Sequence, residues 1–222
     1  MGRVDVVRHG TRAREFPGGI PSGPTGVGSL TIRLYHVDQE ETVMAWPAPV
    51  EALWNDLESV RAQLLKEAGG LSQGQSDWRP SEEEWSVGEI LHHLTLAEVG
   101  TGKLTSKLLK EAPQPLPPFP PDLQGFSPVP APPPGPARAP EVVYPERGHA
   151  LERLIADLKT IRERSRQSVE RLAAVDPRGL RWRHFTLGEM DLAQWWLLHV
   201  RHETDHLQQL RDVKAAKGFP AS

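Results

Sequence analysis

The chain has 222 residues, 38% of them hydrophobic and 25% charged, and a formal net charge of −3. This length and composition predict one folded domain with its own core, and the near-neutral charge argues against binding to nucleic acid or to an anionic membrane surface. The sequence has no cysteine, which excludes disulfides, thiolate metal sites and cysteine nucleophiles. No stretch approaches the roughly 18 apolar residues of a membrane span, and no apolar signal-peptide region opens the chain, so we expect a cytoplasmic protein.

Residues 1–43 indicate a flexible extension rather than a domain. They contain the Gly/Pro-rich stretch FPGGIPSGPTGVGS, followed by the short alternating run LTIRLYHV. Glycine and proline disfavour regular structure, and so short an alternation predicts at most one strand. The first strong helical pattern follows Met44, so we predict the folded domain over residues 44–222.

Two helices are predicted in the first half of this domain. Apolar residues at three- to four-residue spacing predict a helix over residues 48–68. The next helix begins at Ser86, because Ser86 and Glu89 have the spacing of a capping box, in which each side chain binds the backbone N–H of the other. The apolar face of this helix runs from Ile90 to Leu104.

Two more helices are predicted in the second half. The third covers about residues 149–175 and ends before the Asp176-Pro177 pair, because a proline disfavours helical geometry in the residue before it. The fourth begins near Asp191, which forms a second cap with Gln194, and runs to about Lys214.

A proline-rich tract, residues 112–148, separates the two pairs of helices. Fourteen of the 22 prolines lie between Pro113 and Pro145, so the tract can be neither helix nor central strand. Neither pair alone has enough helix to bury its apolar faces. We therefore predict an all-α four-helix bundle in which the tract is a long crossover, with a spacer role favoured over that of a lid or a partner-binding segment.

Histidines gather on two of the predicted helices. At about 100° per residue, His199, His202 and His206 fall within about 60° of arc and continue an apolar stripe, so they should point into the bundle. His93 lies on the apolar face of the second helix, whereas His92 is turned about 100° away and is peripheral. Buried imidazoles must be hydrogen-bonded or metal-bound.

The spacing of the histidines on the last helix suits a metal ion. His202 and His206 are one turn apart, as two ligands of one cation would be, and a third ligand from a facing helix would complete a three-histidine site with one open position. The alternative is a set of core histidines bonded to hydroxyls and carboxylates.

The stretch HETDH, His202 to His206, also has the H-E-x-x-H pattern of zinc proteases, whose glutamate is the general base. The extended form of that pattern requires glycine and histidine downstream, where Gln209 and Asp212 stand. Glu203 is also turned about 100° from His202, so it flanks the predicted site. These features disfavour a protease.

Two stretches together resemble the DinB/YfiT-like superfamily: WSVGEILHHL from Trp85, and LGEMDLAQWWLLHVRHETDHLQQL from Leu187. The resemblance spans about residues 47–215. It implies an up-down-down-up bundle with the long crossover between its second and third helices. It also implies a divalent metal, most commonly zinc or nickel, bound by His93, His202 and His206, with Gln209 at the position of a family glutamine.

The resemblance further implies a class of reaction. Characterised members are similar to transferases and isomerases that use low-molecular-weight thiols such as bacillithiol or mycothiol, and others are labelled as metal-dependent hydrolases. The sequence departs from the family pattern at Asp205, at Leu207-Gln208 and at Leu96, for which Glu98 is the nearest carboxylate. These changes leave the histidines in place but put the identity of the cosubstrate in doubt.

From these features we predict a divalent transition metal bound by His93, His202 and His206, with water in the open position. His199 and Gln209 would lie beside the ligands, and Glu203 is a candidate to orient an imidazole or accept a proton. The predicted function is transfer of a small thiol to a small electrophile. The alternatives are hydrolysis of a small substrate and a non-catalytic metal-binding stress-response module. A homodimer is compatible with the sequence.

Overall fold

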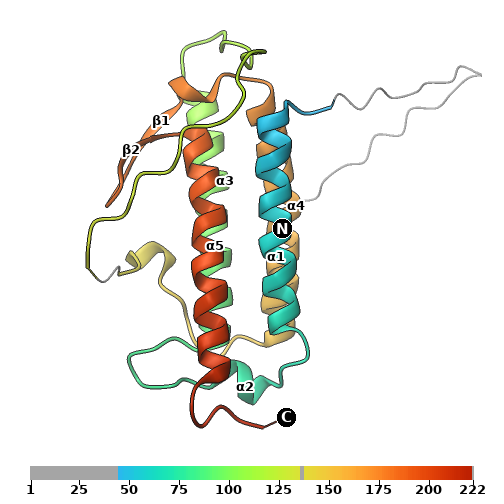
Figure 1. Cartoon of the computed structure of the whole chain (residues 1–222), viewed down its shortest axis with the longest axis vertical. Coiled ribbons are helices and arrows are strands. Elements are labelled where there is room, and N and C mark those ends of the chain that lie inside the picture. Colours follow the sequence, from blue (N-terminus) through green and yellow to red (C-terminus); the bar gives the residue numbers. More distant parts are fainter. Residues whose placement is uncertain (1–44, 136–137, 222) are drawn as a thin grey trace, which may run out of the picture. The chain divides into compact units, whose positions relative to one another are not determined.

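The computed structural model describes residues 45–135 and 138–221 (Figure 1). The predicted extension over residues 1–43, with its single strand at LTIRLYHV, lies outside the described residues.

Four long helices form a bundle (Figure 1), and the predicted four-helix fold is confirmed. Each long helix packs against two others: α3 against α4 and α5, and α1 against the same two. Helices α1 and α5 run in one direction and α3 and α4 in the other, which gives the up-down-down-up order. The four are α1 (Ala48–Ala68), α3 (Val87–Glu111), α4 (Leu151–Ala173) and α5 (Leu192–Ala215).

The starts of α3 and α5 are fixed by the two predicted capping boxes. The Ser86 N–H donates to Glu89 Oε2 at 2.9 Å, and the Glu89 N–H donates back to Ser86 Oγ at 3.2 Å. Asp191 and Gln194 exchange the same pair of bonds at 2.8 and 3.0 Å. Each box satisfies N–H groups that have no partner within the helix, and so fixes where the helix begins.

The core is divided into two apolar clusters along the bundle. One, at the end where α1 finishes, includes Leu64, Leu94, Leu158 and Leu210, and the other, at the opposite end, includes Trp196. Between them lies a group of buried polar and charged side chains. They are Arg61, Glu98, Thr101, Thr105, Arg162, Ser165, His199 and Glu203.

The proline-rich crossover runs along α5 from one end of the bundle to the other (Figure 1). Gln194 and Arg201 of α5 donate hydrogen bonds to the carbonyls of Pro128 and Pro130, at 2.8 and 3.0 Å. Near its end the crossover forms a single 3-10 turn, η1 (Glu141–Val143), which packs against α3. The tract therefore lies on the bundle and is held to it at several points.

Five short elements were not predicted: α2 (Gln73–Asp77), η1, η2 (Pro177–Gly179), and the strands β1 (Arg181–His184) and β2 (Gly188–Asp191), which form a hairpin. The two strands are antiparallel, with Trp182 opposite Met190. Gly188 has a φ of +80°, a conformation that glycine adopts at little cost. Strand β2 leads directly into the Asp191 cap, so the hairpin positions the start of α5.

None of the helices within residues 45–135 and 138–221 has the length and apolar character needed to cross a membrane.

Candidate metal centre

Three histidine side chains from two helices meet in the half of the bundle where α3 begins. His93 Nε2 lies 2.9 Å from His202 Nε2, and His206 Nε2 lies 3.0 Å from the same atom. His202 and His206 are one turn apart on α5, and His93 is in the second turn of the antiparallel α3. The structure thus brings together the three residues that the sequence predicted as ligands.

Hydrogen bonds fix which nitrogens of two of these rings carry the proton. His93 Nδ1 lies 2.7 Å from the carbonyl oxygen of Val143, and His206 Nδ1 lies 2.7 Å from Oε1 of Gln209. Because both oxygens only accept hydrogen bonds, each Nδ1 is the donor. The Nε2 atoms of His93 and His206 therefore present lone pairs to the centre of the cluster.

This arrangement fits a cation. Two lone pairs point at His202 Nε2, which can donate a proton to only one of them, so at least one close nitrogen pair has no hydrogen between its members. A cation bound by all three lone pairs removes the conflict. Zinc–nitrogen bonds of about 2.0–2.1 Å in a tetrahedral site place the ligand nitrogens about 3.3 Å apart, so a small outward shift of the rings suffices.

Burial keeps the three imidazoles in the form that binds metal. Removal from water lowers the pKa of His93 to about 4 and that of His202 to about 2, and it also lowers the pKa of His206. The neighbouring imidazoles lower the pKa of His93 and His202 further. All three rings are therefore neutral near pH 7, and no proton has to leave before a metal ion binds.

Trp85, which immediately precedes the Ser86 cap, forms one wall of the cluster. Its ring stacks on His206, with centroids 5.9 Å apart and planes at 16°. The same ring also packs against His93, with centroids 4.8 Å apart. Tyr144 of the crossover packs against Trp85 in a T-shaped pair, with ring centroids 5.9 Å apart. His93 is buried, whereas His202 and His206 are partly exposed. Three ligands fill three positions of a tetrahedral ion and leave the fourth for a further ligand.

His199 and Glu203 lie deeper, in the polar part of the core. Glu203 is fully buried and its Oε1 accepts hydrogen bonds from Arg61 and Arg162. His199 Nε2 lies 3.6 Å from Glu98 Oε2 and 3.7 Å from Glu203 Oε1. The His199 ring lies beside the cluster, with its centroid 6.3 Å from that of His202, whereas the Glu203 carboxylate is bound by the two arginines.

Glu98, His199 and Glu203 form a second group whose ligand atoms lie within 4.8 Å of one another. Burial alone would raise the pKa of Glu98, but the adjacent His199 and the charges of Arg61 and Arg162 hold it well below its ordinary value. Two guanidiniums already balance the two carboxylates, so a cation here would have to displace them. The three-histidine cluster is the better metal site.

The remaining predicted residues lie at the margins of the three-histidine cluster. Gln209 binds His206 directly, as expected for a residue beside the ligands. His92 is peripheral: its Nδ1 accepts the N–H of Glu146 at 2.9 Å, and its ring packs on His149. Sequence reasoning did not single out Trp85 or the carbonyl of Val143 as parts of the site.

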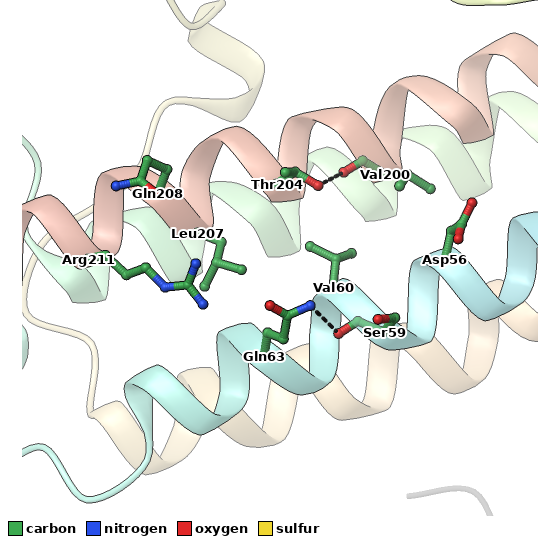
Figure 2. A pocket seen from close by; sticks show the side chains of 9 residues that line it. All are labelled: Asp56, Ser59, Val60, Gln63, Val200, Thr204, Leu207, Gln208 and Arg211. Carbon is green, nitrogen blue, oxygen red and sulfur yellow. Dashed lines mark hydrogen bonds between the residues drawn. The ribbon is translucent and has the colours of Figure 1, made fainter.

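A surface groove of about 310 Å³ between α1 and α5 is separate from this centre (Figure 2). Figure 2 shows side chains from both helices along it, and none of the three histidines is among its lining residues. The lining residues are Asp56, Ser59, Val60, Gln63, Val200, Thr204, Leu207, Gln208 and Arg211.

Comparisons with known proteins agree with this architecture. The fold is similar to that in the crystal structure of TT2238, a four-helix bundle protein, with a TM-score of 0.52 and 18% sequence identity over 73% of this chain and 98% of that chain. At this identity the likeness concerns the fold alone. No curated protein matches the sequence significantly. The sequence matches the DinB superfamily over residues 56–210, which is well over half of its length. The chain therefore belongs to the DinB superfamily.

Proposed function

We propose that this protein binds a divalent transition metal ion, zinc first and nickel second, through Nε2 of His93, His202 and His206. We further propose that it uses the ion to activate a low-molecular-weight thiol for transfer to a small electrophile. The observation that carries the metal site is the convergence of three Nε2 atoms, two of which have no proton of their own. The thiol chemistry rests on the family resemblance and on the partial exposure of His202 and His206.

Three neutral nitrogen ligands leave one coordination position for a small molecule. A metal ion bound there would lower the pKa of a coordinated thiol, as it does for coordinated water, and so supply a thiolate near neutral pH.

The chain's own residues hold and shield this position. The Val143 carbonyl and the Gln209 amide orient the His93 and His206 rings and keep their Nε2 atoms free. The Trp85 ring covers His206 on one face, which limits the approach of water and of substrate to the other side. We do not assign proton transfer to Glu203, because its carboxylate is fully buried and is paired with Arg61 and Arg162.

Metal content tests the first part of this proposal. Elemental analysis of untagged protein should find close to one equivalent of a transition metal in the native chain, and His202→Ala should lose most of it. Less than about half an equivalent in the native protein, unchanged in the variant, would contradict the metal site.

Activity with a model electrophile tests the second part. Monochlorobimane is incubated with the metal-loaded protein, with and without a panel of small thiols. Turnover that requires both thiol and metal supports transfer. Turnover that does not depend on the thiol would indicate hydrolysis. Stoichiometric metal without any turnover would indicate a metal-binding module that is not an enzyme.

A further inference from the structure

Four charged side chains form a layer across the middle of the bundle, between the two apolar clusters. Each long helix contributes one of them, and each is at most 5% exposed. They are Arg61 of α1, Glu98 of α3, Arg162 of α4 and Glu203 of α5. We refer to these four as the charged layer.

Each arginine of the charged layer binds both carboxylates. Arg61 Nη2 donates to Glu98 Oε2 at 2.7 Å and also to Glu203 Oε1. Arg162 donates from Nε to Glu98 Oε1 at 2.9 Å and from Nη2 to Glu203 Oε1 at 2.8 Å. Two positive and two negative charges thus balance within the layer, and all four helices are joined through it.

The two arginines are themselves held by backbone carbonyls. Arg61 of α1 donates from Nη1 to the Leu158 carbonyl of α4 at 2.6 Å, and Arg162 of α4 donates from Nη1 to the Leu57 carbonyl of α1. The guanidiniums are therefore fixed to the two helices that carry no histidine of the metal centre. Guanidinium forks have a set geometry, so their directions constrain the carboxylates they bind.

The two carboxylates belong to the helices that carry the histidines. Glu98 is five residues after His93 on α3, and Glu203 lies between His202 and His206 on α5. Apolar packing alone tolerates small slips and rotations of a helix, whereas directional bonds to a fixed acceptor do not. A slip of α5 relative to α3 would pull the three Nε2 atoms apart.

A gain in folding stability does not explain the charged layer. Desolvating four charges offsets much of their mutual attraction, and well-packed apolar residues often serve a bundle equally well or better. A role in fixing geometry accounts for the observed connectivity, in which the same two arginines reach both histidine-bearing helices.

We propose that the charged layer is a positioning device that sets the register of α3 against α5 and so holds His93 in reach of His202 and His206. This inference rests on the proposed metal site. Glu203 acts here through the helix that carries it, and is a positioning residue rather than a catalytic one.

Metal affinity measured separately from stability tests this role. Metal-free native protein and the isosteric Glu203→Gln variant are titrated with Co²⁺, following the ligand-field absorption of the bound ion, well below the unfolding temperature. We expect Glu203→Gln to bind at least about tenfold more weakly, with an altered Co²⁺ spectrum. The matched control is Glu67→Gln, which removes an ion pair between α1 and α5 away from the layer and should leave affinity within about twofold of native.

A double variant keeps the test decisive if Glu203→Gln alone fails to fold. Arg162→Met with Glu203→Gln removes one charge of each sign, so no buried charge is left without a counterpart. It should fold, as judged by circular dichroism, and still bind Co²⁺ at least about tenfold more weakly than native. Folded variants that bind Co²⁺ within twofold of native, with the native spectrum, would overturn the positioning role and leave the metal site intact. Native protein that binds no metal would overturn both the metal site and the positioning role.

Discussion

The Nε2 atoms of His93 and His202 lie 2.9 Å apart, although 109 residues separate them in the chain. Their contact forms only when α3 and α5 are packed in the register seen here. A ligand that binds both atoms therefore binds the folded bundle and not the unfolded chain, so it must stabilise the fold.

Metal should raise the free energy of unfolding for this reason. At a free concentration of Zn²⁺ about 100 times Kd, one site specific to the folded state contributes about 2.7 kcal/mol. Denaturant unfolding with and without Zn²⁺ measures the difference, and His206→Ala should abolish most of it. Equal stabilisation of native protein and His206→Ala would place the bound metal elsewhere.

Gln209 should affect metal binding more than stability. Gln209→Leu removes the acceptor that orients the His206 ring, and the loss of such a partner typically weakens metal binding by about 10- to 100-fold. Competition with a chromogenic chelator measures the affinity. The control is Gln208→Leu, the exposed neighbour, which bonds to Asp212 and should bind metal normally. A Gln209→Leu protein with native affinity would show that the hydrogen bond does not orient the ligand.

Two glycines of α3 should respond oppositely to alanine. A Cβ on Gly88 would lie 2.9 Å from Ser76 Oγ and 3.3 Å from the Ser76 carbonyl, so Gly88→Ala should push α2 away and cost about 1–3 kcal/mol. A Cβ on Gly100 meets nothing within 4 Å, and Gly100→Ala should stabilise the helix by up to about 1 kcal/mol. Urea unfolding of both variants checks the signs. A neutral Gly88→Ala would show that α2 can move at no cost.

Glu67 links the C-terminal ends of α1 and α5 and should make stability depend on acid pH. Hydrogen bonds from Lys214 and then Arg211 lower its pKa from the ordinary value. A lowered pKa in the folded state means that the carboxylate stabilises the fold above the unfolded-state value, about 4.3, and that this is lost as pH falls through the folded-state value.

Glu67→Gln therefore should cost less than about 1 kcal/mol near neutral pH, because the group is partly exposed. The difference from native should shrink as the pH is lowered below about 4, and added salt should reduce it near neutral pH. Urea unfolding across this pH range provides the measurement. A difference that is the same at every pH would mean that the ion pair contributes nothing.

Much of the bundle follows from local signals in the sequence. The capping boxes at Ser86 and Asp191 act within one turn of chain, and they place the starts of α3 and α5 without reference to the rest of the fold. The predicted third helix, 149–175, is two residues longer at each end than α4. Neither end of α4 has a side-chain cap of this kind, so the sequence did not mark where the helix begins and ends. The proline tract could be placed because prolines as dense as these exclude the interior of a helix, although a single proline such as Pro49 is tolerated in the first turn.

The charged layer and the hairpin could not be predicted, because they depend on distant parts of the chain. A helical projection places Glu203 near the histidine stripe, but it cannot show that Arg61 and Arg162 approach it from two other helices. Both arginines do stand on otherwise apolar stripes, beside Val60 and Ile161, which in retrospect was a signal. The hairpin has only four residues in each strand, too few for a clear alternation.

The crossover divides the chain into two halves that each hold an incomplete set of the same parts. The first half carries one arginine and one glutamate of the charged layer, together with His93. The second half carries the matching arginine and glutamate, together with His202 and His206. Each half already contains one native ion pair, Arg61 with Glu98 in the first and Arg162 with Glu203 in the second, but neither half alone can assemble the three imidazoles. Each long helix of one half packs mainly on the two long helices of the other half, so the two halves act as partners in one interface and the proline-rich connection keeps them together in one polypeptide.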